Sequence, residues 1–178
     1  AMMGIPIDTA TSRETGVLRR YRATPLHPAV YLAASVVVYL AIALLGMAIL
    51  VIVGKIVFGL RMAGSWPSVM AAFLLSAGAF FSVGYLIASV VPTARVAQAV
   101  GMVLFFPMMF LSGAGMPLQL LPEVLQKVSD FLPLTYVVRL IQGLWFGETW
   151  STLWLSALVL AGILAAGTVL ATRYFRWE

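Results

Sequence analysis

Four long stretches without a charged residue dominate this sequence. They cover residues 23–54, 62–94, 96–122 and 149–172. Each exceeds the roughly 20 residues that an α-helix needs to cross a bilayer. The apolar runs are continuous and lack the alternation of barrel strands, so helices are expected, with backbone groups satisfied within each segment. Trimming by polarity predicts spans near 30–53, 68–91, 97–115 and 151–172.

The composition supports the same class, because 62% of the residues are hydrophobic and only 10% are charged. So few charges could not cover the surface of a soluble domain. We therefore predict an all-α integral membrane protein, with residues 1–178 as a single transmembrane domain.

The distribution of lysine and arginine predicts the orientation, since cytoplasmic loops carry an excess of both. An even number of spans places both ends of the chain on one side. That side holds seven basic residues: Arg13, Arg19, Arg20, Arg22, Arg95, Arg173 and Arg176. The other side holds four: Lys55, Arg61, Lys127 and Arg139. Both termini are predicted to be cytoplasmic, in the plasma or inner membrane, so the basic residues serve the bilayer and not a nucleic acid.

Groups for catalysis or metal binding are nearly absent. The sequence has no cysteine and a single histidine, His27. Gly54-Lys55 is followed by isoleucine and lacks the earlier glycine of a phosphate-binding loop. No carboxylate lies within a predicted span. We expect no catalytic residue, no metal site and no cofactor bound by this chain.

A basic segment precedes the first span, and Thr11 and Glu14 have the spacing of a capping box at its start. Pro25 ends the predicted helix of residues 11–24. Apolar and basic residues share its surface, which gives a basic amphipathic helix on the cytoplasmic face. We interpret it as a docking element for a cytoplasmic partner. The alternative is that its arginines only orient the chain and bind anionic headgroups.

The segment between the third and fourth spans is broken by prolines. Pro107 lies inside the third span, and the run from Ser112 to Pro117 ends it. Two short helices are predicted next, Glu123–Leu132 after Pro122 and Thr135–Phe146 after Pro133. Pieces of this length suit re-entrant or interfacial helices. Arg139 either lies at membrane depth, paired with Asp130 or Glu148, or extends to the headgroups.

Small residues recur at four-residue spacing in the fourth span, where Ala157, Ala161 and Ala165 predict close helix packing. A second group could line a path for an amphiphilic molecule, although core or lipid-facing roles are the simpler interpretation. Its members are Ser76, Phe80, Ser82, Tyr85, Phe106 and Met109.

Two segments resemble the permease subunits of the ABC type-2 exporter family. Arg13-Glu14-Thr15-Gly16-Val17-Leu18-Arg19-Arg20-Tyr21-Arg22-Ala23-Thr24-Pro25-Leu26 is similar to the cytoplasmic E-x-G-x-L…T-P-L segment of that family. The region with Phe-Leu-Ser-Gly at 110–113, Leu-Pro-Glu at 121–123 and Leu-Pro-Leu-Thr-Tyr at 132–136 resembles its closing signature.

The resemblance implies that the basic segment is a coupling helix seated in a separate ATP-binding subunit. The docking residues would be Arg13, Glu14, Gly16, Val17, Leu18, Arg19, Arg20 and Tyr21. ATP and Mg would be bound by that partner, and a second permease copy or homologue would complete the transporter. Residues 118–146 would form an external helical hairpin marked by Pro117, Pro122, Glu123, Pro133, Tyr136 and Arg139. Members of the family carry a pair of spans before the coupling helix, so we interpret this chain as the C-terminal two-thirds of a permease or as a shortened one, with 1–29 as the cytoplasmic coupling segment.

The leading hypothesis is the transmembrane subunit of an ATP-driven exporter of drugs, antibiotics or similar amphiphilic molecules. Export of a glycan or lipid is the alternative substrate assignment. A membrane scaffold that does not transport is the alternative from another class, and a membrane-embedded enzyme is disfavoured by the missing acids, histidines and cysteines in the spans.

Overall fold

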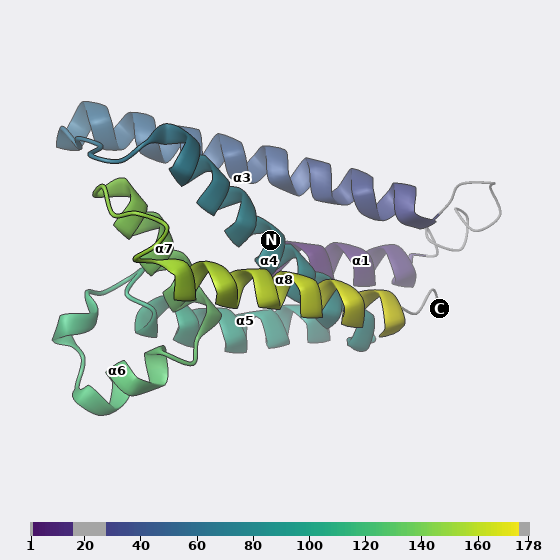
Figure 1. The fold of residues 1–178 in the computed structure, drawn as a ribbon. Coiled ribbons are helices and arrows are strands. Elements are labelled where there is room, and N and C mark those ends of the chain that lie inside the picture. Colours follow the sequence, from purple (N-terminus) through teal and green to yellow (C-terminus); the bar gives the residue numbers. More distant parts are fainter. Residues whose placement is uncertain (1, 16–27, 175–178) are drawn as a thin grey trace.

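The computed structural model describes residues 2–15 and 28–174, and all regular elements in those ranges are helices (Figure 1). In chain order they are α1 (Gly4–Glu14), α3 (Pro28–Phe58), α4 (Trp66–Val90), α5 (Ala94–Leu111), the 3₁₀ turn η1 (Leu118–Leu120), α6 (Glu123–Ser129), α7 (Pro133–Trp145) and α8 (Trp154–Tyr174). The predicted all-α class is confirmed.

Within the described residues, four helices are long and apolar enough to cross a bilayer, as the sequence predicts. They are Ala33–Phe58, Trp66–Val90, Ala94–Leu111 and Trp154–Arg173. The third begins and ends earlier than the predicted 97–115. Thr93 caps its start by accepting a hydrogen bond from the Val96 amide, and Gly113, with a φ of 87°, follows its end.

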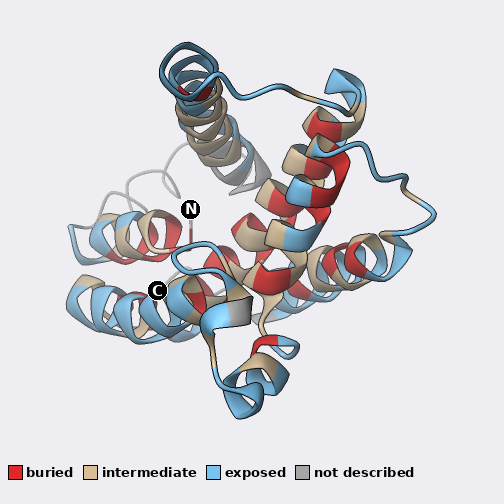
Figure 2. Ribbon diagram, turned by 90° about the vertical axis from the view of Figure 1, so that its left-hand side faces the viewer, coloured by how far each residue is buried: buried red, intermediate tan, exposed pale blue. Residues whose placement is uncertain are grey.

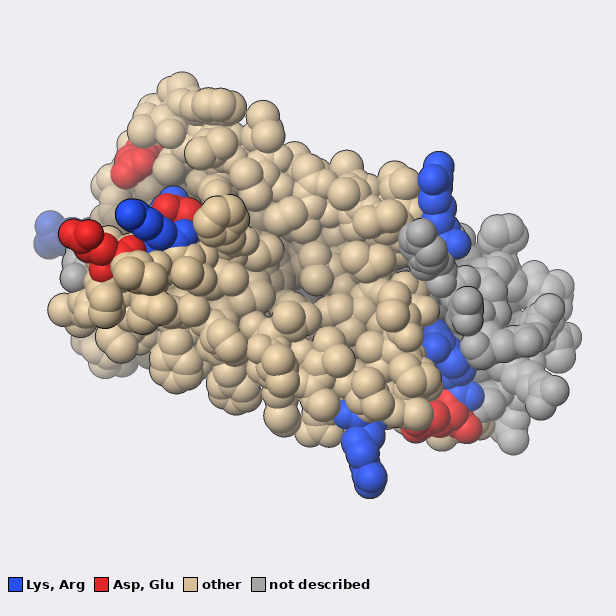
Figure 3. Space-filling model, turned by 90° about the horizontal axis from the view of Figure 1, so that it is seen from below, with Lys and Arg blue, Asp and Glu red and all other residues tan. Residues whose placement is uncertain are grey.

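Charged side chains gather towards the two ends of the bundle, with a broad apolar belt between them (Figure 3). The end of α1 and the C-terminal end of α8 lie at one end, whereas α6 and the start of α8 lie at the other (Figure 1). We call these the terminal end and the hairpin end. The arrangement matches the spacing of charges that a bilayer imposes on a multi-span helical protein.

The core lies where α4 meets α8 and α7. α4 and α8 form the largest helix–helix interface of the described residues, and buried residues are concentrated on the inward faces of the helices (Figure 2). The central cluster is entirely apolar and consists of Val69, Ala72, Ala79, Leu140, Leu144 and Leu160. Without a hydrophobic drive between helices inside lipid, such close packing and interhelical hydrogen bonds hold the bundle together.

The packing face of α8 agrees with the prediction at Ala157, which packs against the central cluster, but not at the two other alanines. Ala161 and Ala165 are exposed, whereas Ser156, Leu160 and Gly167 are buried. α8 is apolar around its whole circumference, so the alanine spacing alone did not identify the face that packs. Gly167 of α8 lies so close to Ser82 of α4 that a side chain at position 167 would overlap with it.

Helix α3 stands apart from the other spans. None of the residues in its most apolar window is buried, and its contacts with α4 are few. Its C-terminal connection is held firmly, because the amides of Ala63 and Gly64 both donate to the Trp145 carbonyl at 3.1 Å. Lys55 lies 5.1 Å from the centre of the Trp66 ring at the same end. α3 is thus tied to the bundle at the hairpin end, and nearer the terminal end Val36, Tyr39 and Leu40 pack against a second cluster of buried residues on α1, α4 and α8.

Candidate functional site

The last turn of α1 binds the turn that joins α4 to α5. The two terminal nitrogens of the Arg13 guanidinium donate to the carbonyls of Ala88 and Val91, at 3.1 and 3.2 Å. The Glu14 carboxylate accepts a hydrogen bond from the Ala94 amide at 3.1 Å. A cation therefore lies at the C-terminal end of α4 and an anion at the N-terminal end of α5.

These placements match the partial charges that backbone dipoles give to helix ends. They also satisfy carbonyl and amide groups that have no partner within their own helices. Hydrogen bonds to an ionised group are stronger than neutral ones. We call residues Arg13 and Glu14 with this turn the α1 clamp. It joins the end of α1 to two of the spans at once.

The predicted helix start at Thr11 is wrong. α1 begins at Gly4, and the Thr11 hydroxyl donates to the Ile7 carbonyl at 2.8 Å inside the helix. Hydroxyls of mid-helix threonine commonly bond to the carbonyl one turn back, so the spacing to Glu14 here does not mark a helix start. Ile5, Pro6, Thr9 and Ala10 are buried, and α1 packs against α4 and α5. This part of the expected coupling segment lies within the bundle.

The six other docking residues of the sequence analysis lie outside the described residues. They are Gly16, Val17, Leu18, Arg19, Arg20 and Tyr21. The segment that contains them follows directly on the α1 clamp, so it is attached to the bundle through Arg13 and Glu14. Arg13 and Glu14, the two docking residues that the structure describes, both have intramolecular contacts.

The hairpin end carries the two short helices that the prolines predict. Pro122 and Pro133 stand at the starts of α6 and α7, where a missing amide costs little. Arg139 pairs at 2.6 Å with Asp130, which is one of the two partners considered from the sequence. Both side chains are about half exposed, at 43% and 52%, and an exposed pair contributes roughly 0.2–1 kcal/mol. Glu148, the other predicted partner of Arg139, instead lines a cavity of about 460 Å³ beside Gly64.

The Leu-Pro-Leu-Thr-Tyr motif has a structural explanation. The fully buried Thr135 hydroxyl donates to the Ser129 carbonyl at 2.6 Å, and the Tyr136 hydroxyl donates to the Asp130 carbonyl at 2.7 Å. Both bonds reach from the first turn of α7 to the end of α6, where the Ser129 carbonyl also accepts from the Leu132 amide. The motif therefore sets the angle between the two hairpin helices.

The hydroxyl of Thr135 is expected to matter for stability. Thr135→Val removes one of the two hydrogen bonds to the Ser129 carbonyl, which also accepts from the Leu132 amide at 3.0 Å, and should lower the free energy of unfolding by about 0.5–1.5 kcal/mol. Thr135→Ser keeps the hydroxyl and should recover most of the loss. The control Thr168→Val removes an exposed hydroxyl that bonds only within α8 and should have little effect. Denaturation of the purified protein in mixed micelles would measure all three, and equal stability of Thr135→Val and wild type would contradict this role.

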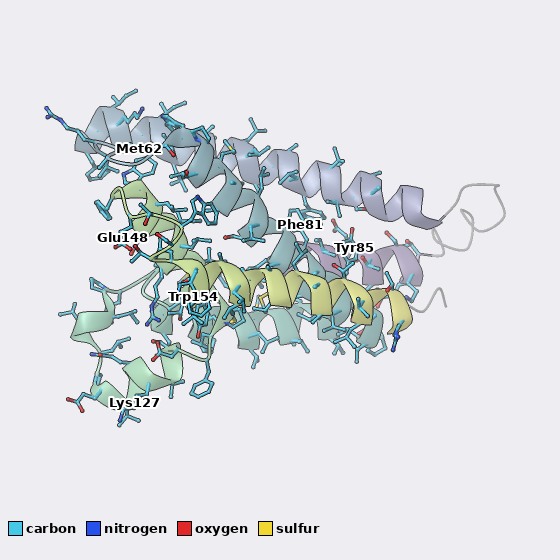
Figure 4. All side chains as sticks on the ribbon, viewed as in Figure 1. Met62, Phe81, Tyr85, Lys127, Glu148 and Trp154 are labelled. Carbon is cyan, nitrogen blue, oxygen red and sulfur yellow. The ribbon has the colours of Figure 1, made fainter. Side chains whose placement is uncertain are left out.

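The predicted path residues do not form one surface. Ser76 and Ser82 are buried, and their hydroxyls donate to the Ala72 and Ala79 carbonyls within α4. Ser82 also donates to the Ile163 carbonyl of α8 at 3.2 Å. Phe106, by contrast, is 49% exposed on α5, and Phe80 and Met109 are half-buried. Tyr85 is buried on α4 near α1 (Figure 4). The two serines thus act in helix packing.

Comparison with known proteins places this chain in a family. The sequence model of the ABC-2 type transporter family matches residues 1–146, which include the α1 clamp, three of the spans and the hairpin. The chain belongs to the ABC-2 type transporter family. Nodulation protein J of Sinorhizobium fredii is 36% identical over 81 residues, which are 44% of this chain and 31% of that relative. No solved structure matches.

Membership of the ABC-2 family agrees with the resemblance stated from the two motifs. It makes the chain a membrane component of the transporter type. The chain region matched to Nodulation protein J spans about a third of that relative's length, and the relative's name specifies no transported substrate.

Sequence reasoning missed two features of this ABC-2 chain. The first is that Arg13 and Glu14 bond to α4 and α5 within this chain, whereas the docking interpretation assigned both side chains to a partner. The second is Asp8, which lies on α1 and accepts a hydrogen bond from the Tyr39 hydroxyl of α3. An acid three residues after the buried Ile5 and directly before the buried Thr9 could have been noticed as a carboxylate on a membrane-packed helix.

Proposed function

We propose that this chain is the transmembrane subunit of an ABC exporter driven by a separate ATP-binding subunit. Its family membership and its four candidate spans support that role. In this proposal the terminal end of the bundle is cytoplasmic, because it adjoins the arginine-rich segment. A second permease copy or homologue completes the pathway, and ATP and Mg are bound by the partner.

The α1 clamp is the observation that carries the proposal. The basic segment of residues 11–24 contains Arg13 and Glu14, which bond to the ends of α4 and α5. A partner that moves this segment therefore acts directly on two spans. The absence of a phosphate-binding loop in the sequence fits an energy source on another chain.

The substrate proposed is an amphiphilic small molecule such as a drug or antibiotic. Glycan or lipid export is the alternative. Transport assays on vesicles that contain the assembled complex would distinguish them, since each class predicts accumulation of a different labelled compound.

Co-purification tests the ATPase partner. The chain would be co-expressed with the ATP-binding-cassette protein encoded beside it, and the expected result is a stable complex whose ATP hydrolysis is stimulated. Arg19→Glu with Arg20→Glu should reduce the yield of complex by about tenfold or more, because two charges are reversed and the net charge of the interface changes by about four units. Arg13 is left unchanged in this test, since its side chain supports the fold.

The matched control reverses the same charge at the same end of the bundle. Arg95 is exposed at the start of α5 and Arg173 in the last turn of α8, so Arg95→Glu with Arg173→Glu should leave the complex intact. An undiminished complex with the Arg19 and Arg20 variant would refute docking on this segment. Membrane insertion without stimulation of any ATPase would favour the scaffold alternative.

A further inference from the structure

A cavity of about 510 Å³ lies between α1, α3 and α4. Its volume falls within the range of sites for small molecules. It is distinct from the hairpin and from the α1 clamp, although five residues of its lining belong to α1: Ile5, Asp8, Thr9, Thr11 and Ser12. The lining residues are Ile5, Asp8, Thr9, Thr11, Ser12, Ala34, Ser35, Val38, Tyr39, Ile42 and Tyr85.

The cavity contains one ionisable acid and no basic residue. Asp8 is exposed on α1, between the buried positions Ile5 and Thr9. Its carboxylate accepts a hydrogen bond from the Tyr39 hydroxyl, and an ionised carboxylate has room for further donors. No salt bridge joins Asp8 to a lysine or arginine among the described residues. The other described acids lie elsewhere, Glu14 at the α4–α5 turn and three at the hairpin end.

The wall of the cavity around Asp8 has a polar part and an apolar part. Hydroxyl-bearing side chains of α1, α3 and α4 line the cavity with Asp8, while Ile5, Val38 and Ile42 supply apolar surface. An acid on a helix that packs among membrane spans is costly and usually serves a function. A ligand that matches both parts of the wall has a cationic group with N–H donors for the carboxylate and a hydrocarbon part for the apolar surface.

We propose that this cavity binds amphiphilic amines, with the Asp8 carboxylate as the counter-ion of the ammonium group. Tyr39 holds the carboxylate in place, and the apolar wall contacts the hydrocarbon part of the amine. α1 begins part-way along the bundle and runs to the terminal end (Figure 1), so the cavity lies in the half of the bundle next to that end. As an entry site for exported molecules this rests on the proposed function, whereas binding itself does not.

Direct binding of labelled dodecylamine tests the proposal without an ATPase. The full chain would be placed in nanodiscs of phosphatidylcholine, which carry no net charge, with empty nanodiscs subtracted. Asp8→Asn keeps the size of the side chain and removes its charge. It should weaken dodecylamine binding by roughly tenfold or more. Dodecanol, the neutral analogue, should bind wild type and variant equally.

The control is Glu148→Gln, which removes a carboxylate from the separate cavity at the hairpin end and should leave dodecylamine binding unchanged. Asp8→Glu restores the charge and should restore most of the affinity, which guards against loss of binding through misfolding. Competition by added phosphatidylethanolamine would identify a lipid headgroup as the source of the ammonium, and its failure would identify a free amine.

Equal dodecylamine affinity of wild type and Asp8→Asn would overturn the proposal. An equal loss in Asp8→Asn and Glu148→Gln would do so too, because it would show a general effect of charge. A chain that binds dodecylamine as expected but forms no complex with an ATP-binding subunit would contradict the proposed function alone.

Discussion

Replacing Gly167 with leucine is expected to disrupt the packing of α8 against α4. A Cβ atom at this position would lie 2.8 Å from the Ser82 Cβ and 3.2 Å from its carbonyl carbon. Both helices must then move apart, and the hydrogen bond from Ser82 to the Ile163 carbonyl would be lost. Overpacking of this kind costs about 3 kcal/mol. Unfolding in mixed dodecyl sulfate micelles would show the variant denaturing at a much lower mole fraction of dodecyl sulfate.

The chain provides a control for this prediction on the same helix. Gly162 has no neighbouring atom within 4 Å of its would-be Cβ. Gly162→Leu should therefore match or slightly exceed the wild type in stability, because leucine has the higher helix propensity. Similar unfolding of the Gly162 and Gly167 variants would contradict the assigned packing face of α8.

Loss of the Arg13 guanidinium is expected to loosen the junction between α4 and α5. Arg13→Met keeps much of the apolar side chain but removes both bonds to the Ala88 and Val91 carbonyls. Together, the two hydrogen bonds from this half-buried charged group contribute about 2 kcal/mol. Where amides exchange through local opening, their loss in the variant corresponds to roughly thirtyfold faster hydrogen exchange. The amides of residues 88–96 are the ones to follow by exchange and mass spectrometry.

Arg13→Lys is the informative comparison for the α1 clamp. Its ammonium keeps the charge but lacks the planar fork of the guanidinium, so it should protect these amides only in part. Exchange of the hairpin helices α6 and α7 serves as the internal reference and should stay the same. If residues 88–96 exchanged at the wild-type rate in Arg13→Met, the clamp would have no mechanical role.

The spans and the hairpin could be predicted because their signals are strong and local. A continuous apolar run identifies a span whatever it packs against. Pro122 and Pro133 mark helix starts through the geometry of their own backbone. The sequence offers Asp130 and Glu148 as partners for Arg139, and the structure shows the pair with Asp130.

Features that depend on which helix faces which were not predictable in the same way. The apolar circumference of α8 gave no reason to prefer Gly167 over Ala161 and Ala165 as a packing position. Thr11 and Glu14 have a spacing that fits a helix start and a helix interior equally well. Arg13 and Glu14 bond to backbone groups some 80 residues away in the sequence, and no local pattern encodes such contacts.

The attachment of α3 has a consequence for the Asp8 cavity. Trp145 holds the α3–α4 connection at the hairpin end, and α3 lines one side of the cavity in the opposite half of the bundle. Tyr39 also joins α3 to Asp8 at the cavity itself, so we expect a tilt of α3 about the hairpin end to break this hydrogen bond as the entrance widens. Tilt is the usual response of a long span to bilayer thickness. We therefore expect access to Asp8 to change with the thickness of the surrounding membrane.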